Sequence, residues 1–256
     1  MWFILKSYII YFFTAKRNFS SFSPFVQDFY NNIIAKDVDT TIEQKVKKLR
    51  TFYRNENRNL VLEDYGAGSK SKKRKNTINT KELVNKVAVQ KKYGKILSNL
   101  NAHYKVNQVL ELGTSLGIGS TFLSNAKVTS IEGNSALAEY TSNSLHKFKI
   151  DSVNIITAKF DDVLEDLLNK NNFELIYIDG NHTKEATIKY FETIINQDFK
   201  PKILIFDDIY WSFGMNNAWK YIKSNKNIAI SIDLFKFGIV FLNYKEVIKE
   251  DIVIWA

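Results

Sequence analysis

Three aspartates and a histidine stand where they could act together in chemistry. Asp179 closes the segment FELIYIDG, Asp207 and Asp208 close PKILIFDD, and His182 follows three residues after Asp179. If both segments are parallel strands of one sheet, their side chains meet at the sheet edge where ligands of such folds bind. Carboxylates that converge in one crevice repel one another, so a proton or a cation must offset their charge.

Two chemistries suit this group of residues. In the first, a hard divalent cation such as Mg²⁺ binds Asp179, Asp207 and Asp208 and lowers the pKa of an acceptor hydroxyl. In the second, His182 acts beside Asp179 as a metal-free general base, because an imidazole titrates near neutral pH. Both remain open at the level of sequence.

A glycine-rich turn in the stretch VLELGTSLGIGS could hold a nucleotide. A dinucleotide-binding turn needs a third small residue after Gly117 and Gly119, where this chain has Phe122. The Gly-Lys-Ser/Thr sequence of a phosphate-binding loop is also absent. What remains is an acid, Glu111, followed by Gly113 and Gly117. An acid at the end of a buried strand suits a cationic ligand, and S-adenosylmethionine carries a sulfonium and an ammonium.

A second acid follows at the spacing expected for a ribose contact. Glu132, in the segment SIEG, lies 19 residues beyond Gly113. An acid at the tip of the second strand can accept hydrogen bonds from both ribose hydroxyls. Glu132, with Gly133 directly after it, therefore joins the turn in the predicted cofactor site.

Hydrophobic patterning predicts the elements that position these residues. After Val106, five short apolar runs alternate with polar helical segments, which is typical of a parallel sheet wound with helices. Two later runs are joined only by a short basic turn at Lys236, which allows an antiparallel hairpin but no crossover helix. We predict an α/β fold with a doubly wound, Rossmann-like sheet of five parallel strands and a C-terminal antiparallel hairpin. The runs are QVLELG, KVTSIEG, VNIITA, FELIYIDG and PKILIFDD, then NIAISIDLF and FGIVFLNY.

The first 105 residues show helical patterns and few strand signals. Helices are predicted over 23–35, 40–55 and 80–104, and the segment 63–77, rich in Gly, Ser and Lys, is predicted to be a loop. The apolar N-terminus is too short and too interrupted to span a bilayer. We expect it to form an aromatic helix that docks on its own domain or on a partner, with membrane association as an alternative. The predicted organisation is a helical cap over 1–105 and a cofactor-binding domain over 106–256.

Composition and charge exclude some functions. The 256 residues contain no cysteine, which excludes disulfides, thiolate nucleophiles and cysteine-bound metals and fits a reducing cytoplasm. The net charge of +9 is concentrated between Lys45 and Lys105, where 17 Lys and Arg residues stand against 4 Asp and Glu residues. This region could attract nucleic acid or another anionic partner, and a solvated lysine-rich face explains it as well.

The glycine turn followed by VTSIEG resembles motif I and the acidic motif of class I S-adenosylmethionine-dependent methyltransferases. The form E-L-G-x-x-x-G-x-x-S/T is most similar to the catechol O-methyltransferase-like branch, with Ser115 in the place of the usual middle glycine. The whole chain also resembles a group of bacterial class I methyltransferases, through SPF at 23–25 and DYGAGS at 64–69. These resemblances imply the fold and the cofactor, but no particular acceptor.

The resemblance also implies residue roles. The turn would line the methionine part of S-adenosylmethionine, Glu132 would hold the ribose, and Phe160 and Asp161 would frame the adenine. Metal-dependent relatives carry Asp-Asn where this chain has Asp207 and Asp208, which is a departure from their pattern. The implied cofactor-binding residues are Glu111, Gly113, Thr114, Ser115, Gly117, Gly119, Glu132, Gly133, Phe160, Asp161 and Asp179.

We therefore predict methyl transfer from S-adenosylmethionine to a small or medium-sized acceptor, at a hydroxyl oxygen. One alternative is an RNA or protein methyltransferase that docks its substrate through the basic region 45–105. Another is a binding protein that kept the fold but lost transfer. Neither the acceptor nor the oligomeric state follows from the sequence.

Overall fold

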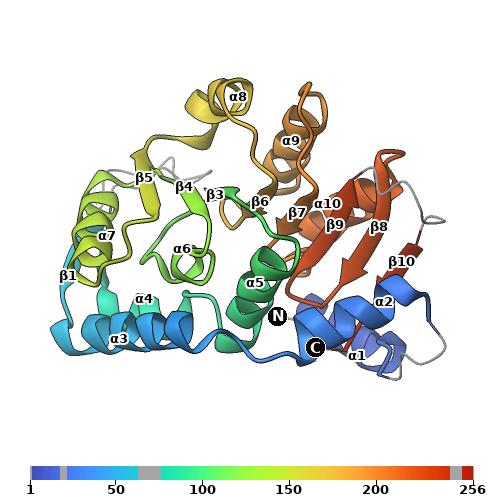
Figure 1. Cartoon of the computed structure of the whole chain (residues 1–256), viewed down its shortest axis with the longest axis horizontal. Helices are drawn as coiled ribbons and strands as arrows, with labels where there is room; N and C mark the ends of the chain where they lie inside the picture. Colours follow the sequence, from blue (N-terminus) through green and yellow to red (C-terminus); the bar gives the residue numbers. More distant parts are fainter. Residues whose placement is uncertain (1, 18–21, 63–75, 243–249, 256) are drawn as a thin grey trace. The chain divides into compact units, whose positions relative to one another are not determined.

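The computed structural model describes most of the chain, in the ranges 2–17, 22–62, 76–242 and 250–255 (Figure 1). These residues form two compact units. Unit 1 joins Met1–Tyr30 to Glu165–Ala256, and unit 2 is the continuous segment Asn31–Leu164. The ends of unit 2 do not coincide with the expected boundary at residue 105, and the division into a helical cap and a cofactor domain stays a prediction.

Unit 2 contains a parallel sheet made of three of the predicted strands. They are β3 (Gln108–Leu112), β4 (Lys127–Glu132) and β5 (Val153–Thr157), which lie side by side in this order. The helices of this region are α6 (Ile118–Phe122), α7 (Ser135–Lys147) and α8 (Phe160–Lys170). Because the strands are parallel, their carboxyl ends share one edge, and the predicted cofactor residues follow those ends.

The N-terminal part of unit 2 is helical, as predicted, but it also contains a small antiparallel sheet. The two strands of that sheet flank the predicted loop, and residues 63–75 of the loop lie outside the described residues. The sequence pattern does not predict these strands. The elements are the π-helix η1 (Tyr30–Ala35), α3 (Thr40–Glu56), β1 (Asn59–Leu62), β2 (Asn76–Asn79), α4 (Thr80–Lys86) and α5 (Lys91–His103).

The prediction of one helical stretch over 80–104 is wrong, because α4 and α5 are separate helices. The end of a helix leaves carbonyls without intrahelical partners. The Arg50 guanidinium of α3 donates to two carbonyls at this break, those of Val84 at 3.2 Å and of Val89. Val89 is itself buried. A tertiary contact that periodicity does not reveal therefore stabilises the interruption.

Unit 1 contains five strands in a mixed sheet: β6 (Leu175–Ile178), β7 (Ile203–Phe206), β8 (Ile228–Asp233), β9 (Gly238–Leu242) and β10 (Glu250–Val253). Their spatial order is β10-β8-β9-β7-β6. β6 and β7 are parallel, and β8 and β9 form the predicted antiparallel hairpin, with β9 also antiparallel to β7. The sequence pattern does not predict β10, a short strand that pairs parallel to β8.

The helices of unit 1 are α1 (Trp2–Thr14), α2 (Pro24–Phe29), α9 (Lys184–Ile195) and α10 (Phe213–Ser224). α1 docks on its own unit, one of the two outcomes expected for it. Tyr11 is buried there, and its hydroxyl donates to the Ile254 carbonyl at 2.6 Å. In the part of the chain that the structure describes, every helix is too short or too polar to cross a membrane.

Candidate active site

The glycine turn of unit 2 has a backbone that explains its sequence. Gly113, Ser115 and Gly117 have φ angles of 108°, 48° and 67°. Glycine adopts positive φ without steric cost, whereas other residues rarely do. Gly113 and Gly117 are therefore required by the chain path, and Ser115 holds a left-handed conformation where related turns place glycine.

Glu132 braces this turn from the end of β4. One carboxylate oxygen accepts the Ser115 N–H at 2.9 Å, and the other accepts the Asn134 N–H at 3.0 Å. The Thr141 hydroxyl donates to the Ser115 carbonyl at 2.7 Å, which fixes the turn from the other side. A carboxylate has about four lone-pair positions. Glu132, which is half-buried, can therefore brace the turn and still accept ribose hydroxyls.

Glu111 lies beneath the turn and is only 1% exposed. Its carboxylate accepts the hydroxyls of Ser120 and of Ser130, the latter at 2.6 Å. The hydroxyls of Ser130 and Thr114 are also 2.6 Å apart, so a buried polar network joins Glu111 to the turn. Burial raises the pKa of Glu111 to about 7, against the opposing effect of the two serine hydroxyls. In this position Glu111 supports the turn, and a direct contact with the cofactor stays a prediction.

Phe122 is the residue that departs from the dinucleotide fingerprint, and the structure shows what replaces the missing glycine. A Cβ atom on Gly94 of α5 would lie 2.0 Å from the Phe122 ring. The close approach is therefore provided by a glycine on the neighbouring helix. At Gly117, a Cβ atom would lie 3.0 Å from Thr141 and 3.2 Å from Leu145, so that position is also tightly enclosed.

The remaining predicted cofactor residues of unit 2 lie beside or just after the same strand ends. Gly119 is half-buried in α6, and Gly133 directly follows β4. Phe160 is half-buried at the start of α8, and Asp161 is exposed in its first turn. An acid there also interacts favourably with the helix dipole. Within unit 2 the predicted cofactor residues therefore collect around the carboxyl edge of one parallel sheet.

The predicted catalytic and metal residues collect in unit 1 and form an acid cluster, which we define as Asp179, His182, Asp207, Asp208 and Lys236. Asp179 and Asp207 follow strands whose last residues are paired in register, which brings the two carboxylates together. Both accept hydrogen bonds from the hydroxyl of buried Tyr177, at 2.9 Å and 3.3 Å. His182 Nε2 lies 3.7 Å from Asp179 Oδ1 and 3.9 Å from Asp208 Oδ2.

Lys236 is the member of the acid cluster that sequence reasoning missed as a site residue. Its Nζ lies 3.3 Å from Asp207 Oδ2 and 3.1 Å from Asp208 Oδ1. The pairing of Phe206 with Gly238 explains this placement, because it sets the β8–β9 turn beside the end of β7. The sequence shows a basic turn at Lys236, but it does not show which strand that turn faces.

The charges of the acid cluster are balanced internally. Burial and the neighbouring Asp179 carboxylate raise the pKa of Asp207, which is 2% exposed, well above its ordinary value. Burial also raises the pKa of Asp179 to about 6, although Lys236 and the hydroxyl of Tyr177 oppose the shift. Burial lowers the pKa of Lys236, but the three carboxylates raise it by more, so the pKa lies above its ordinary value. The cluster therefore favours a protonated Lys236 together with a carboxyl group, that of Asp207, that keeps its proton.

These contacts do not fit a divalent cation bound by the three aspartates. Mg²⁺ needs unprotonated oxygens at about 2.0–2.1 Å in near-ideal octahedral geometry. Asp207 is the most deeply buried of the three, its oxygens already accept Tyr177, Lys236 and the Asp208 N–H, and its pKa favours protonation. Among the described residues, no three His, Asp or Glu side chains are arranged to hold a metal ion. The acid cluster favours the metal-free alternative.

Three residues in or next to the acid cluster have left-handed backbone conformations. Asn181, Asp208 and Phe235 have φ angles of 50°, 54° and 68°. Such conformations persist only where surrounding structure holds them, and they are common at functional sites. Asp233 holds Phe235 in place, because its carboxylate accepts the Phe235 N–H at 2.9 Å and the Tyr210 hydroxyl at 2.8 Å. Asp233 therefore positions the turn that carries Lys236.

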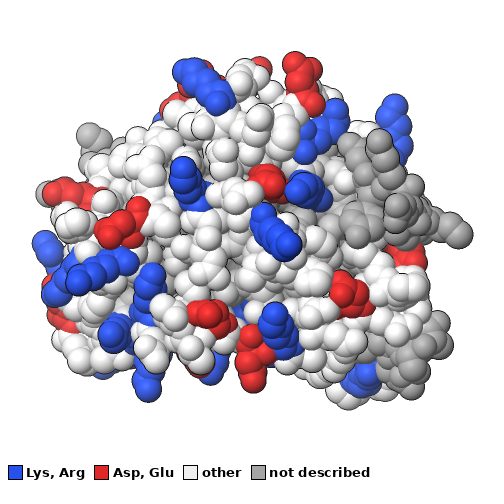
Figure 2. Space-filling model, viewed as in Figure 1, with Lys and Arg blue, Asp and Glu red and all other residues white. Residues whose placement is uncertain are grey.

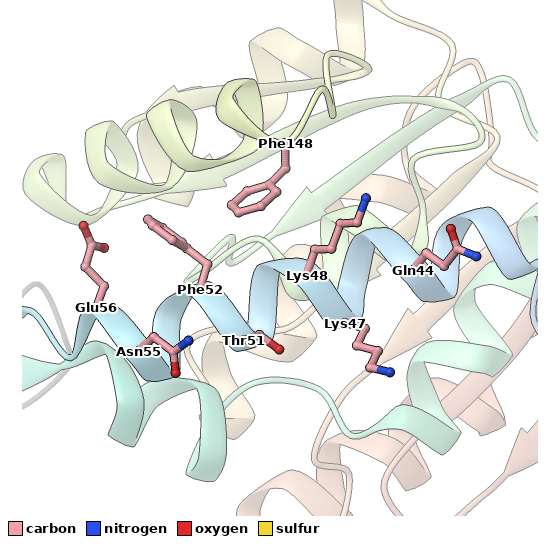
Figure 3. A pocket seen from close by; sticks show the side chains of 8 residues that line it. All are labelled: Gln44, Lys47, Lys48, Thr51, Phe52, Asn55, Glu56 and Phe148. Carbon is pink, nitrogen blue, oxygen red and sulfur yellow. The ribbon is translucent and has the colours of Figure 1, made fainter.

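Unit 2 also has a cavity of about 780 Å³ beside α3 (Figure 3). The Phe52 and Phe148 rings contact one another edge-on there, with centroids 5.3 Å apart. Lys and Arg side chains, with some acids between them, gather over the place of α3 (Figure 2). The cavity is lined by Gln44, Lys47, Lys48, Thr51, Phe52, Asn55, Glu56 and Phe148.

Residues 110–209 match the sequence model of a protein family described as a methyltransferase domain. That range begins in β3 and ends just after the Asp207–Asp208 pair, so it includes the glycine turn and most of the acid cluster. Residues 110–209 are therefore similar to a methyltransferase domain over the part of the chain that holds both groups of residues. A search of curated protein sequences found no match.

Solved structures confirm the fold class. The SAH-bound methyltransferase PaMTH1 from Podospora anserina has a TM-score of 0.58 and 13% identity, over 89% of this chain and 99% of its own. The O-methyltransferase TomG from Streptomyces achromogenes, in complex with SAM, has a TM-score of 0.55 and 14% identity, over 85% and 96%. An O-methyltransferase from Bacillus cereus in complex with SAH has a TM-score of 0.54 and 16% identity, over 84% and 95%. The chain has the Rossmann-like fold of class I methyltransferases.

Proposed function

We propose that this chain transfers a methyl group from S-adenosylmethionine to a hydroxyl oxygen of a small or medium-sized acceptor. The observation that carries the proposal is a histidine flanked by two carboxylates, His182 with Asp179 and Asp208, within a methyltransferase domain. The names of the similar solved structures, which include O-methyltransferases bound to SAM or SAH, support the same reading. The lack of cysteine favours a cytoplasmic location.

The cofactor is assigned to the glycine turn of unit 2. Gly113, Thr114, Ser115 and Gly117 would line its methionine part, with Gly119 and Gly133 beside them. Glu132 would accept the ribose hydroxyls with the lone pairs that its two backbone hydrogen bonds leave free. Phe160 would stack on the adenine and Asp161 would accept from its amine, as their places after β5 suggest.

The reaction is a displacement at a methyl carbon. The acceptor oxygen forms a bond to that carbon, the carbon–sulfur bond breaks, and its electron pair stays on sulfur as a neutral thioether that needs no acid. Alignment of the reacting atoms lowers the barrier by several kcal/mol. His182 would take the hydroxyl proton, which contributes roughly two to four powers of ten. The carboxylates of Asp179 and Asp208 then stabilise the imidazolium.

Lys236 supplies the positive charge that the carboxylates of this cluster require. Its ammonium lies against Asp207 and Asp208 and offsets their repulsion. The carboxylates of Asp179 and Asp208 therefore remain available to His182. The proposed reaction proceeds without a bound metal.

The cofactor assignment is tested by titrating the protein with S-adenosylmethionine and S-adenosylhomocysteine in a calorimeter. Glu132→Ala removes the predicted ribose acceptor and the brace on Ser115, so we expect its affinity to fall at least about tenfold. Glu139→Ala, an exposed acid on α7, is the matched control and should bind as the unchanged protein does. Equal binding by both variants, or no binding at millimolar ligand, would refute the assignment.

A second candidate, a methyltransferase acting on RNA, is favoured by the cavity beside α3. Lys47 and Lys48 line that cavity together with Phe52 and Phe148, and a site that combines cationic and aromatic side chains suits single-stranded nucleic acid. This candidate predicts RNA binding that weakens steeply between low and moderate salt and is lost in Lys47→Glu/Lys48→Glu. Binding that is independent of salt would count against it.

A further inference from the structure

α1 carries apolar side chains around most of its circumference, with Lys6 as its one charged residue, and only one of its faces is covered. Ser7 and Tyr11 are its buried residues. The Tyr11 ring packs on Phe235 and Trp255, with centroids 5.3 Å and 5.5 Å apart, and its hydroxyl donates to Ile254. These contacts fix one stripe of the helix on unit 1.

The opposite face of α1 is exposed and mostly apolar, and it includes the side chain of Lys6. At 100° per residue, positions 2, 5, 9, 12 and 13 lie opposite positions 7 and 11. Trp2 is 78% exposed and Phe13 is 79% exposed. We define the apolar face of α1 as Trp2, Leu5, Ile9, Phe12 and Phe13, together with exposed Ile10 at its edge.

Such a surface is unusual for the exterior of a protein. A helix that is hydrophobic all round is normally buried all round. Seven of the thirteen large hydrophobic side chains that are exposed in the described residues belong to α1. The surface continues beyond the helix, because Phe3 contacts Phe213 edge-on at 6.0 Å and Phe213 is 66% exposed. Contiguous exposed apolar surface of this kind marks an interaction site.

The charges around the apolar face identify the partner. The sequence contains no Asp or Glu before Asp28, while Lys6, Lys16 and Arg17 are all exposed. The Arg17 guanidinium lies over the rings of Phe12 and Trp255, at 4.7 Å and 4.5 Å. A second copy of this chain would bring the same cations face to face in a symmetric contact. An anionic lipid surface, in contrast, can cover the apolar side chains with its acyl chains and pair with the cations through its headgroups.

The length of α1 decides how it would meet a lipid surface. Its 13 residues extend about 20 Å, whereas the hydrocarbon core of a bilayer is about 30 Å thick. Interfacial helices instead lie in the plane of the headgroups, with Trp and Phe toward the acyl chains and Lys and Arg at the headgroups. We infer that the apolar face of α1 binds in this way to membranes that contain anionic lipid.

Co-sedimentation with lipid vesicles tests this inference. The full chain is mixed with vesicles of phosphatidylcholine alone, or of phosphatidylcholine with phosphatidylglycerol. We expect binding to the second kind, weakened by salt, and little binding to the first. Ile9→Ser/Phe13→Ser should reduce the partition coefficient roughly tenfold or more. Val87→Ser/Phe199→Ser, which changes two exposed apolar residues elsewhere, should leave it unchanged.

Three results would overturn the inference. The first is absence of binding to the anionic vesicles, and the second is equal binding by the Ile9→Ser/Phe13→Ser variant at unchanged thermal stability. The third is a concentration-dependent dimer, without vesicle binding, that the Phe13→Ser change dissolves; it would assign the apolar face to a second copy of the chain. Lys6→Glu/Lys16→Glu separates charge from apolar contact, because it should abolish the preference for phosphatidylglycerol.

Discussion

At the scale of single residues, Lys236 shows what the sequence can and cannot predict about the acid cluster. A sequence can show acids at strand ends, and Asp179, Asp207 and Asp208 were identifiable because each follows a buried apolar run. A sequence cannot show the register of an antiparallel strand. The pairing of β9 with β7 places Lys236 beside those acids. The residue that offsets their charge could therefore not be predicted.

Removal of Lys236 should change what the acid cluster binds. In Lys236→Ala, Asp207 and Asp208 lose the ammonium within 3.3 Å, and we expect methyl transfer to fall roughly tenfold to a hundredfold as carboxylate repulsion misplaces His182. We also expect the variant to bind Mn²⁺ measurably by electron paramagnetic resonance, unlike the unchanged protein. The activity of the unchanged protein should withstand a chelator.

Lys202→Ala is the control for this prediction, since Lys202 is exposed and pairs with Glu174 rather than with the cluster. It should keep both activity and metal behaviour. Loss of activity in the unchanged protein on chelation, restored by Mg²⁺, would show that Lys236 does not replace a metal.

Glu111 gives a prediction about pH. Its pKa in the folded protein is about 7, above its ordinary value of 4.5, because it is buried. Between these values the folded state holds more protons than the unfolded state, so its contribution to stability falls as pH rises from about 4.5 to 7. Above pH 7 the ionised group costs about 3 kcal/mol.

Glu111→Gln keeps the acceptor for Ser120 and Ser130 but cannot ionise. Relative to the unchanged protein, the unfolding free energy of the variant should therefore improve by about 1–3 kcal/mol between pH 5 and pH 8. Urea denaturation at both pH values measures this difference, with Glu139→Gln on the protein surface as a pH-insensitive control. A difference that stays constant with pH would contradict the raised pKa.

At the scale of elements, the sequence pattern predicted most successfully the strands and helices that are determined by their own residues. Seven strands could be predicted because short apolar runs alternate with polar helical segments, four of the first five runs end in Gly or Asp, and the last two are joined by a short turn. β1, β2 and β10 are four residues each and depend on pairing with a distant partner, so their own patterns are uninformative. The interruption between α4 and α5 depends on Arg50 from another helix, and helical periodicity continues across it.

The contact between α5 and α6 predicts a steric effect. A methyl group on Gly94 would overlap the Phe122 ring at 2.0 Å. Gly94→Ala should lower the unfolding free energy by about 2–3 kcal/mol, because overpacking outweighs the helix propensity of alanine. Thermal and urea denaturation provide the measurement.

Two further variants distinguish the steric overlap with Phe122 from the general effect of replacing a helical glycine by alanine. Gly94→Ala/Phe122→Leu should recover part of the loss, since the smaller side chain leaves room for the methyl group. Gly214→Ala, where the nearest side-chain atom would be 3.5 Å away, should be neutral or slightly stabilising. An unaltered stability for Gly94→Ala alone would show that the two helices can move apart without cost.

At the scale of the whole molecule, unit 1 is assembled from both halves of the sequence. Tyr11 donates to a carbonyl 243 positions away, and Lys16 forms a parallel bridge with the same residue, Ile254. Tyr11→Phe removes this buried hydrogen bond and should cost about 1 kcal/mol or slightly more. Hydrogen exchange should then show faster exchange at 253–255, with Tyr8→Phe as the exposed control. Unchanged protection there would mean that the bridge holds without the hydroxyl.

That same long-range assembly has a consequence for synthesis on the ribosome. α1 is translated before its docking partners Ile254 and Trp255, which follow more than two hundred positions later. At about 5–20 residues per second, this delay lasts roughly 10–50 s. Unit 2, whose residues are continuous, can fold during the delay. The nascent chain therefore exposes the whole aromatic segment of α1 during this delay, and a chaperone or a nearby bilayer can contact that segment before its own domain does.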